Sequence, residues 1–223
     1  MVANGVSAWN PTVDQLMHWG ADNAGYVLLG DQWWRIVTAM FVHVGIIHLA
    51  ANMWCLWNLG LLAEPLMGSY GLIAVYILTG AGGNLLSTLY NWLKFHTVNV
   101  FPGGAGASGA VFGIAGALIV LLKSKQLPVP QQEVRKLRKS VIYFAAINLL
   151  IGLSVNLGSG FTGVEVDNSA HVGGLLCGLL FAVPMVPRIG SSRSEFRFKM
   201  RMTVALTVLL LVLFGFYIST LAR

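Results

Sequence analysis

Charged side chains are scarce in this sequence. Of its 223 residues, 10% are Asp, Glu, Lys or Arg and 56% are hydrophobic, and the mean hydropathy is +0.72. A soluble domain typically carries about 25% charged residues. So few charges cannot cover a surface that faces water, which excludes a soluble domain and predicts an integral membrane protein.

The sequence also has few cysteines and no recognisable signal peptide. Its two cysteines, Cys55 and Cys177, both fall inside apolar stretches. They are interpreted as small buried hydrophobic residues, and no disulfide is inferred. Residues 1–32 lack the charged start and apolar run of a signal peptide, so none is expected.

Long apolar stretches are abundant instead. A helix needs roughly 20 mostly apolar residues to cross the hydrocarbon core of a bilayer. The predicted fold class is therefore all-α, a polytopic membrane helix bundle in contact with lipid. The predicted spans are 44–62, 71–93, 106–122, 140–159, 169–187 and 202–220.

The net charge of +6 raises the question of a nucleic-acid partner, and the placement of the charge argues against one. Two segments hold 11 of the 14 basic residues. One segment lies between the third and fourth predicted spans, and the other lies between the fifth and sixth. Short Lys/Arg-rich loops stay in the cytoplasm, so the charge predicts topology. These residues are Lys123, Lys125, Arg135, Lys136, Arg138 and Lys139, then Arg188, Arg193, Arg197, Lys199 and Arg201.

With those loops inside, the segments 1–43, 94–105 and 160–168 and the C-terminus are predicted to face outward, and the link 63–70 inward. Four tryptophans in residues 1–43 favour the headgroup level of the membrane. The apolar piece 33–43 is too short to span and is predicted to be interfacial or re-entrant. Pro65 is predicted to end the first span.

Four polar side chains are predicted to lie at one depth, near the outer ends of three spans. His48 and Asn52 are four residues apart on one helix face, and Ser108 and His171 each lie in the first turn of a span. Each has a structural interpretation: Ser108 bonding its own backbone, His171 as a satisfied core histidine, Asn52 linking helices. Their convergence at one depth favours a functional interpretation.

Small residues provide the space such a site needs. Glycines recur along the third and fifth spans, and small-xxx-small stripes let helix backbones approach closely. A serine and a histidine share a proton only when their heavy atoms are about 2.6–3.2 Å apart. The glycines beside Ser108 and His171 are Gly106, Gly109, Gly113 and Gly116, then Gly174 and Gly178.

These residues predict a Ser–His dyad. His171 is the candidate base for Ser108, and the Asn52 amide, the His48 imidazole and the Ser108 backbone N–H are candidate donors to an oxyanion. Phe112 is expected to pack against the imidazole. No carboxylate third member is predicted, since Glu64 lies roughly 24 Å along the helix from His48 and Asp167 is better placed to cap the fifth span.

The motifs resemble those of the rhomboid intramembrane serine proteases. They occur in the family's order, and the match runs from about residue 9 to 187. The matching pieces are Trp34-Arg35, His43-x4-His48-x3-Asn52, Gly106-Ala107-Ser108-Gly109 and Ala170-His171-x2-Gly174-x3-Gly178.

The resemblance implies cleavage of single-span membrane proteins near the outer face of the membrane, by a six-helix core without a metal or other cofactor. It implies Ser108 as nucleophile, His171 as base, His48, Asn52 and the Ser108 N–H as oxyanion hole, and loop 157–168 as a flexible cap. A multi-pass protein of a bacterial-type plasma membrane, with its active site facing outside, is the expected location.

The sequence departs from the family in beginning within the outer arm, so the usual first core helix is expected to be missing from this chain. The expected organisation is an outer arm (1–43), a rhomboid catalytic core (44–187), a basic cytoplasmic linker (188–201) and an additional C-terminal helix (202–223). Two alternatives remain: a catalytically compromised rhomboid-like binding or quality-control protein, and a transporter or metal site of His43, His48 and His171.

Overall fold

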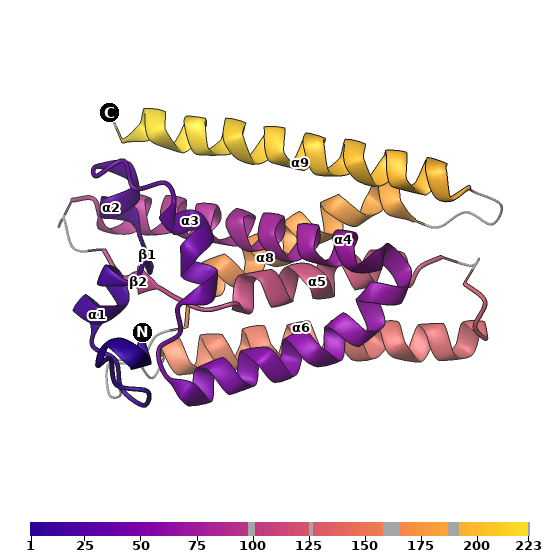
Figure 1. Cartoon of the computed structure of the whole chain (residues 1–223), viewed down its shortest axis with the longest axis horizontal. Helices are drawn as coiled ribbons and strands as arrows, with labels where there is room; N and C mark the ends of the chain where they lie inside the picture. The colour runs from indigo at the N-terminus through magenta and orange to yellow at the C-terminus, as the bar shows by residue number, and fades with distance from the viewer. Residues whose placement is uncertain (98–100, 125–126, 158–165, 187–191, 223) are drawn as a thin grey trace.

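The computed structural model describes residues 1–97, 101–124, 127–157, 166–186 and 192–222. It is a bundle of long, roughly parallel and antiparallel helices with a cluster of short elements at one end (Figure 1). The helices of the bundle are α4 (Ile46–Phe95), α5 (Ser108–Leu121), α6 (Gln131–Leu157), α8 (Asn168–Ala182, followed by the 3-10 turn η3, Val183–Met185) and α9 (Arg193–Leu221). The predicted fold class is confirmed.

Four of the described helices are long and apolar enough to cross a membrane: α4, α6, α8 with its 3-10 extension, and α9. The fifth, α5, has only 14 residues and lies at the centre of the bundle. Its residues 109–118 are all buried, because α4, α6 and α8 surround it. A helix that is apolar on every face is stable when other helices or lipid surround it, and here other helices do.

Helix α4 turns back on itself, which corrects the prediction for Pro65. Pro65 lies inside the helix, and the break falls at Gly68, whose φ of 73° and ψ of 165° are non-helical. That positive φ is readily adopted only by glycine. The Ser69 hydroxyl donates a hydrogen bond of 2.5 Å to Glu64 across the break. The predicted link 63–70 is therefore a single-residue kink between two antiparallel halves of α4 (Figure 1).

The basic segments begin their helices earlier than predicted. Helix α6 starts at Gln131 and not near residue 140, and α9 starts at Arg193 and not near residue 202. Much of the basic sequence is thus helical, where charges three and four residues apart pair along one face. Lys136 pairs with Glu133 and Lys199 with Glu195, each at 2.8 Å.

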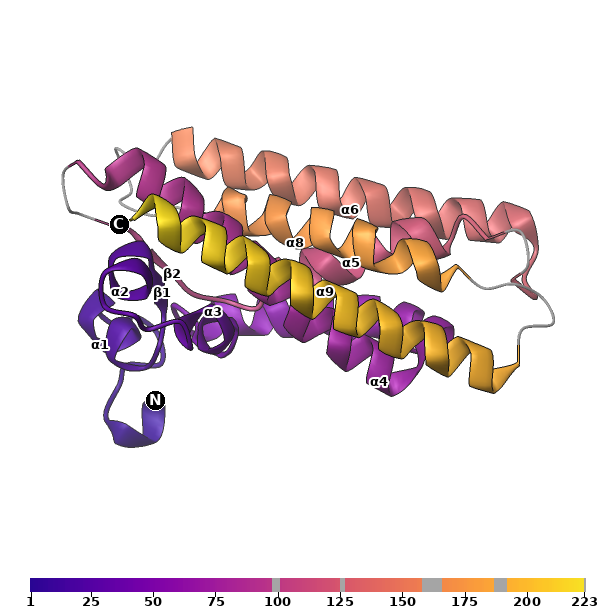
Figure 2. The same ribbon diagram turned by 90° about the horizontal axis from the view of Figure 1, so that it is seen from above.

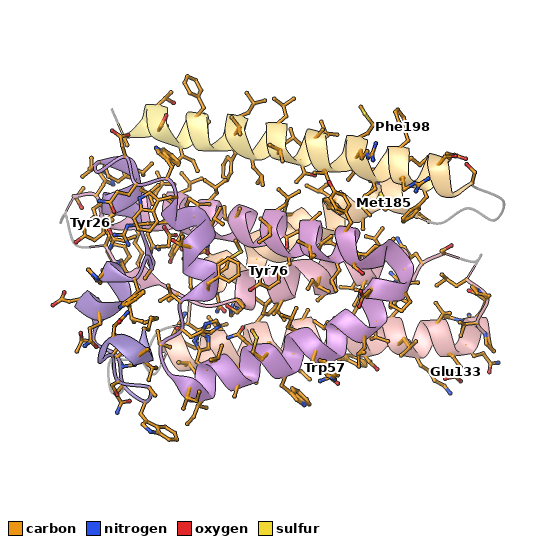
Figure 3. The ribbon with its side chains drawn as sticks, in the orientation of Figure 1. Tyr26, Trp57, Tyr76, Glu133, Met185 and Phe198 are labelled. Carbon is orange, nitrogen blue, oxygen red and sulfur yellow. The ribbon has the colours of Figure 1, made fainter. Side chains whose placement is uncertain are left out.

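Residues 1–43 form an arm of short elements, which lies at the opposite end of the bundle from these basic segments. In Figure 3, Tyr26 of the arm and Glu133 of α6 mark the two ends. None of the arm's elements is long enough to span a membrane. They are η1 (Val2–Asn4), α1 (Val13–His18), β1 (Asp22–Asn23), α2 (Ala24–Leu28), α3 (Arg35–Thr38) and η2 (Ala39–Phe41).

The arm also contains a strand, which the sequence did not predict. Strand β1 pairs antiparallel with β2 (Gly103–Gly104), with Asp22 opposite Gly104. This pairing joins the arm to the segment that leads into α5. Seen from above, the arm lies beside α4 and α9, with α6 on the other side of the bundle (Figure 2). The side-chain amide of Asn84 in α4 also donates a hydrogen bond of 2.8 Å to the Ile36 carbonyl of the arm.

Candidate active site

Ser108 is the first residue of α5, within the first helical turn as predicted, and the loop before it is held by the arm. The Gly106 N–H donates a hydrogen bond of 3.0 Å to the Ala39 carbonyl. The Ala107 N–H donates one of 3.4 Å to His43 Nε2. Two arm residues therefore fix the approach to Ser108, whose backbone N–H lies at the start of a helix, where no intrahelical acceptor exists.

Gly106 has a different role from the one predicted for it. It precedes α5 and so does not belong to the glycine stripe of that helix. Its φ is +135°, and a Cβ at this position would lie 2.6 Å from His48 Cε1. Gly106 is therefore required by backbone conformation and by the imidazole of His48 against it.

His171 lies in the first turn of α8 and faces Ser108. Its Nε2 is 2.8 Å from the Ser108 Oγ, a hydrogen-bond distance suited to proton transfer, and only 7% of the residue is exposed. The structure thus brings the two predicted side chains together. Asp167 caps α8 as predicted, since its Oδ1 accepts from the Ala170 N–H at 3.0 Å.

The imidazole is oriented by an aromatic ring. The Phe112 ring stacks on it with centroids 4.4 Å apart and an interplanar angle of 13°, as the sequence predicted. Phe144 of α6 lies behind Phe112, at a centroid distance of 6.1 Å. The other ring nitrogen, His171 Nδ1, is buried and has no hydrogen-bond partner in the described part of the chain. No described carboxylate therefore bonds the imidazole in the manner of a triad.

Glycines bring the two helices together, as predicted. A Cβ on Gly174 would overlap the Gly109 carbonyl, and a Cβ on Gly178 would overlap the Gly113 carbonyl. The backbones of α5 and α8 are thus in direct contact along two turns. This close approach sets the short distance between Ser108 and His171.

His48 and Asn52 lie in the first two turns of α4, beside the loop that leads to Ser108. Asn52 is buried, and its Nδ2 donates a hydrogen bond of 3.0 Å to the His48 carbonyl one turn earlier. His48 Nδ1 is buried without a partner among the described residues. The structure thus brings the His48 ring to Gly106, two residues before Ser108, while the predicted roles of both residues as oxyanion donors stay predictions.

His43 is a contact that the prediction of site residues missed. Burial, foremost, and the neighbouring His48 lower the pKa of His43 to about 4. The ring is therefore neutral at pH 7 and can accept the Ala107 N–H. Its position five residues before His48 was the available signal.

Among the described residues, no three His, Cys, Asp or Glu side chains come together as metal ligands, so the alternative metal site of His43, His48 and His171 is not formed.

Comparison with known proteins identifies the family. The Rhomboid domain model matches residues 30–188. The chain belongs to the rhomboid family. This rhomboid chain is an integral membrane protein, given its apolar spanning helices and this membership. Residues 158–165 of the loop predicted to cap the site lie outside the described residues.

Several curated proteins resemble this rhomboid chain. It is 30% identical over 187 residues to the rhomboid protease GluP of Bacillus subtilis, covering 83% of the chain and 32% of GluP. It is 31% identical over 180 residues to the rhomboid protease AarA of Providencia stuartii, covering 77% of the chain and 62% of AarA. A mitochondrial RHOMBOID-like protein 6 of Arabidopsis thaliana is 33% identical over 187 residues, covering 84% of the chain and 55% of that protein. The chain thus spans between about a third and three fifths of these relatives.

Proposed function

We propose that this protein is an intramembrane serine endopeptidase that uses Ser108 as nucleophile and His171 as general base. The observation that carries the proposal is the 2.8 Å contact between Ser108 Oγ and His171 Nε2, within a family whose matched members include two named rhomboid proteases. A serine hydroxyl is a weak nucleophile until an adjacent base removes its proton.

In the proposed reaction His171 Nε2 takes the proton of Ser108 as Oγ attacks the carbonyl carbon of the scissile peptide. The imidazolium then gives that proton to the leaving amine, which leaves an acyl group on Ser108. A water, deprotonated by the same nitrogen, hydrolyses the acyl-enzyme and restores the hydroxyl. Stacking on Phe112 supports this cycle, because it keeps Nε2 directed at Ser108 while the charge of the ring changes.

The negative charge on the attacked carbonyl oxygen needs donors that are already in place. The Ser108 N–H is such a donor, because the first amides of a helix have no partner within it. The His48 ring, against Gly106, and the second Asn52 Nδ2 proton are the proposed additional donors. The first Asn52 proton is held by the His48 carbonyl, which fixes the direction of the amide.

The proposed substrates are single-span membrane proteins, cleaved close to the membrane face where the arm lies. Ser108 and His171 sit at the arm end of their helices, and the basic segments of α6 and α9 lie at the other end (Figure 1). Because basic segments stay in the cytoplasm, the site faces outside, in a bacterial-type plasma membrane.

Labelling with a serine-directed fluorophosphonate tests the proposal. The wild-type protein in detergent is expected to label and to cleave a single-span reporter, whereas Ser108→Ala does neither. Ser154→Ala is the matched control, because Ser154 is also in a spanning helix but its hydroxyl donates to the Leu150 carbonyl of the same helix. Equal labelling of wild type and Ser108→Ala contradicts the protease assignment and favours a rhomboid-like binding protein.

A further inference from the structure

Asp22 is a buried carboxyl that the proposed reaction does not use. It lies in β1, only 2% exposed, between the arm and the bundle. The Thr88 hydroxyl of α4 reaches its two oxygens at 3.2 and 3.5 Å, and the Asn23 N–H also donates to it. Ionised carboxylates are almost never buried without stronger pairing than this.

Arg35, the cation that acts on Asp22, forms no ion pair with it in the described structure. Arg35 attracts it only weakly, because the guanidinium is committed elsewhere: one nitrogen donates to the Met17 and Ala21 carbonyls at 2.7 and 2.8 Å, and Nε donates to Gln32 at 2.7 Å. Asp22 is therefore a buried acid without an ion pair in the described structure.

Asp167, its acidic neighbour, is in the opposite situation. Its carboxylate accepts from the Ser87 hydroxyl, the Ser169 hydroxyl and the Ala170 N–H, at 2.5, 2.5 and 3.0 Å. Three donors therefore satisfy this carboxyl group by hydrogen bonding. The consecutive α4 residues Ser87 and Thr88 thus hold one carboxyl each, and Asp167 repels a second negative charge on Asp22.

The position of Asp22 connects it to the loop before the serine. Asp22 pairs with Gly104 across the β1–β2 ribbon, and Gly104 is four residues before Ser108. A Cβ on Gly104 would lie 3.3 Å from Asp167 Oδ2 and 3.7 Å from Asp22 Cβ. The strand that leads to Ser108 therefore lies against both aspartates.

We propose that Asp22 is a positioning residue that fixes the loop before Ser108, and that it does so in its neutral, protonated form. Neutral Asp22 docks β1 on Thr88, and β1 in turn holds β2 and the residues that enter α5. Ionisation places a second buried charge beside Asp167 and loosens the ribbon. The consequence for catalysis rests on the proposed role of Ser108, but the docking itself does not.

The expected pH dependence has a definite sign. Burial, foremost, and Asp167 raise the pKa of Asp22 from 3.8 to about 7, against smaller lowering effects of Thr88, the Asn23 N–H and Arg35. A raised pKa means that the stabilising contribution is complete below about pH 4. It falls as the pH rises toward 7 and is lost above it.

The first experiment measures stability in a Ser108→Ala background, so that its result does not depend on protease activity. Thermal unfolding midpoints of the detergent-solubilised protein are measured between pH 5 and 9, with and without an added Asp22→Asn change. Because the amide stays neutral, the midpoint of Asp22→Asn relative to its parent is expected to rise by about 5 °C or more from pH 5 to pH 9. Asp14→Asn is the matched control for an Asp-to-Asn change, since Asp14 is an exposed acid of the same arm.

Hydrogen exchange supplies a second measurement, which tests the proposal even in a protein that keeps Asp22. In the same Ser108→Ala protein, amides of residues 21–24 and 103–106 are expected to lose about tenfold or more protection between pH 6 and 8.5, after correction for the intrinsic rate of exchange. Asp22→Asn is expected to keep that protection. Unchanged protection with Asp22 present overturns the proposal, even if Asp22→Asn fails to fold. Where both proteins fold, identical pH profiles also overturn it.

Where cleavage is measurable with Ser108 present, the ratio of kcat at pH 8.5 to kcat at pH 6.5 is expected to rise about threefold or more in Asp22→Asn. A merely structural role, independent of protonation, predicts the same ratio in both proteins. One outcome separates the two proposals. If Asp22→Asn changes the pH dependence of hydrogen exchange but no protein cleaves the reporter, the docking proposal stands and the protease function is rejected.

Discussion

At the scale of single residues, the site differs from a three-residue catalytic triad in what holds the histidine. A triad uses a buried carboxylate to fix the tautomer and the ring plane. Here the ring plane is fixed by Phe112, stacked at 4.4 Å, and Asp167 is engaged in capping α8. Orientation without a carboxylate leaves the aromatic ring as the principal constraint on Nε2.

We therefore predict that Phe112→Leu lowers kcat about three- to tenfold while the protein stays folded. An aromatic pair contributes about 0.5–1.5 kcal/mol beyond its buried area, which corresponds to such a change in rate. Phe144→Leu is the control, because Phe144 packs on Phe112 without reaching the imidazole. Steady-state cleavage of a single-span reporter provides the measurement, and equal kcat values for the two variants would contradict an orienting role for Phe112.

Much of this residue-scale arrangement followed from the sequence. Ser108 and His171 each begin a span that enters from the same side, so their depth was predictable from charge and hydropathy. The contact of His43 with the Ala107 N–H was not, because it depends on the path of a loop. Gly106 was assigned to a helical stripe because spacing alone does not reveal its φ of +135°.

At the scale of elements, the contact between α5 and α8 decides the geometry of the site. Two glycine pairs place the helix backbones against each other. A methyl group at such a position has no space and must push the helices apart, because overpacking a filled interface costs about 1–3 kcal/mol.

Gly178→Ala is predicted to reduce cleavage by more than tenfold, with a lowered unfolding midpoint. The added Cβ meets the Gly113 carbonyl and separates Ser108 from His171. Gly60→Ala is the matched control: a Cβ there would lie 3.8 Å from Leu72 Cδ2, an ordinary contact distance, and alanine favours a helix by about 1 kcal/mol over glycine. Cleavage rates and thermal midpoints measured side by side test this, and a Gly178→Ala protein as active as Gly60→Ala would refute it.

The elements themselves were predictable to different degrees. Apolar length located the spans, because the bilayer requires it. The starts of α6 and α9 were placed too late, since charged residues such as Arg135 and Lys199 continue a helix beyond its apolar part. Strands β1 and β2 have two residues each, too few for any alternation of side chains to appear in the sequence.

At the scale of the whole molecule, the two ends of the bundle differ in kind. One end carries the arm, the site and the C-terminal end of α9, and the other carries the basic starts of α6 and α9 (Figure 1). This polarity is the structural basis for the proposed orientation, because basic segments resist transfer across the membrane.

Single cysteines placed at the two ends are predicted to report opposite sides. In a background without Cys55 and Cys177, Trp9→Cys is expected to react with a membrane-impermeant maleimide in intact cells. Lys136→Cys is expected to react only after the membrane is opened. Both side chains are exposed in the structure. Labelling of position 136, and not position 9, in intact cells would reverse the orientation.

The pairing of the arm with the bundle also orders the assembly of the chain during synthesis. Asp22 emerges from the ribosome early, but its partner Thr88 lies 66 residues later. At about 5–20 residues per second, translation of that interval takes about 3–13 s. The amino-terminal segment must therefore stay undocked until the returning half of α4 has been synthesised.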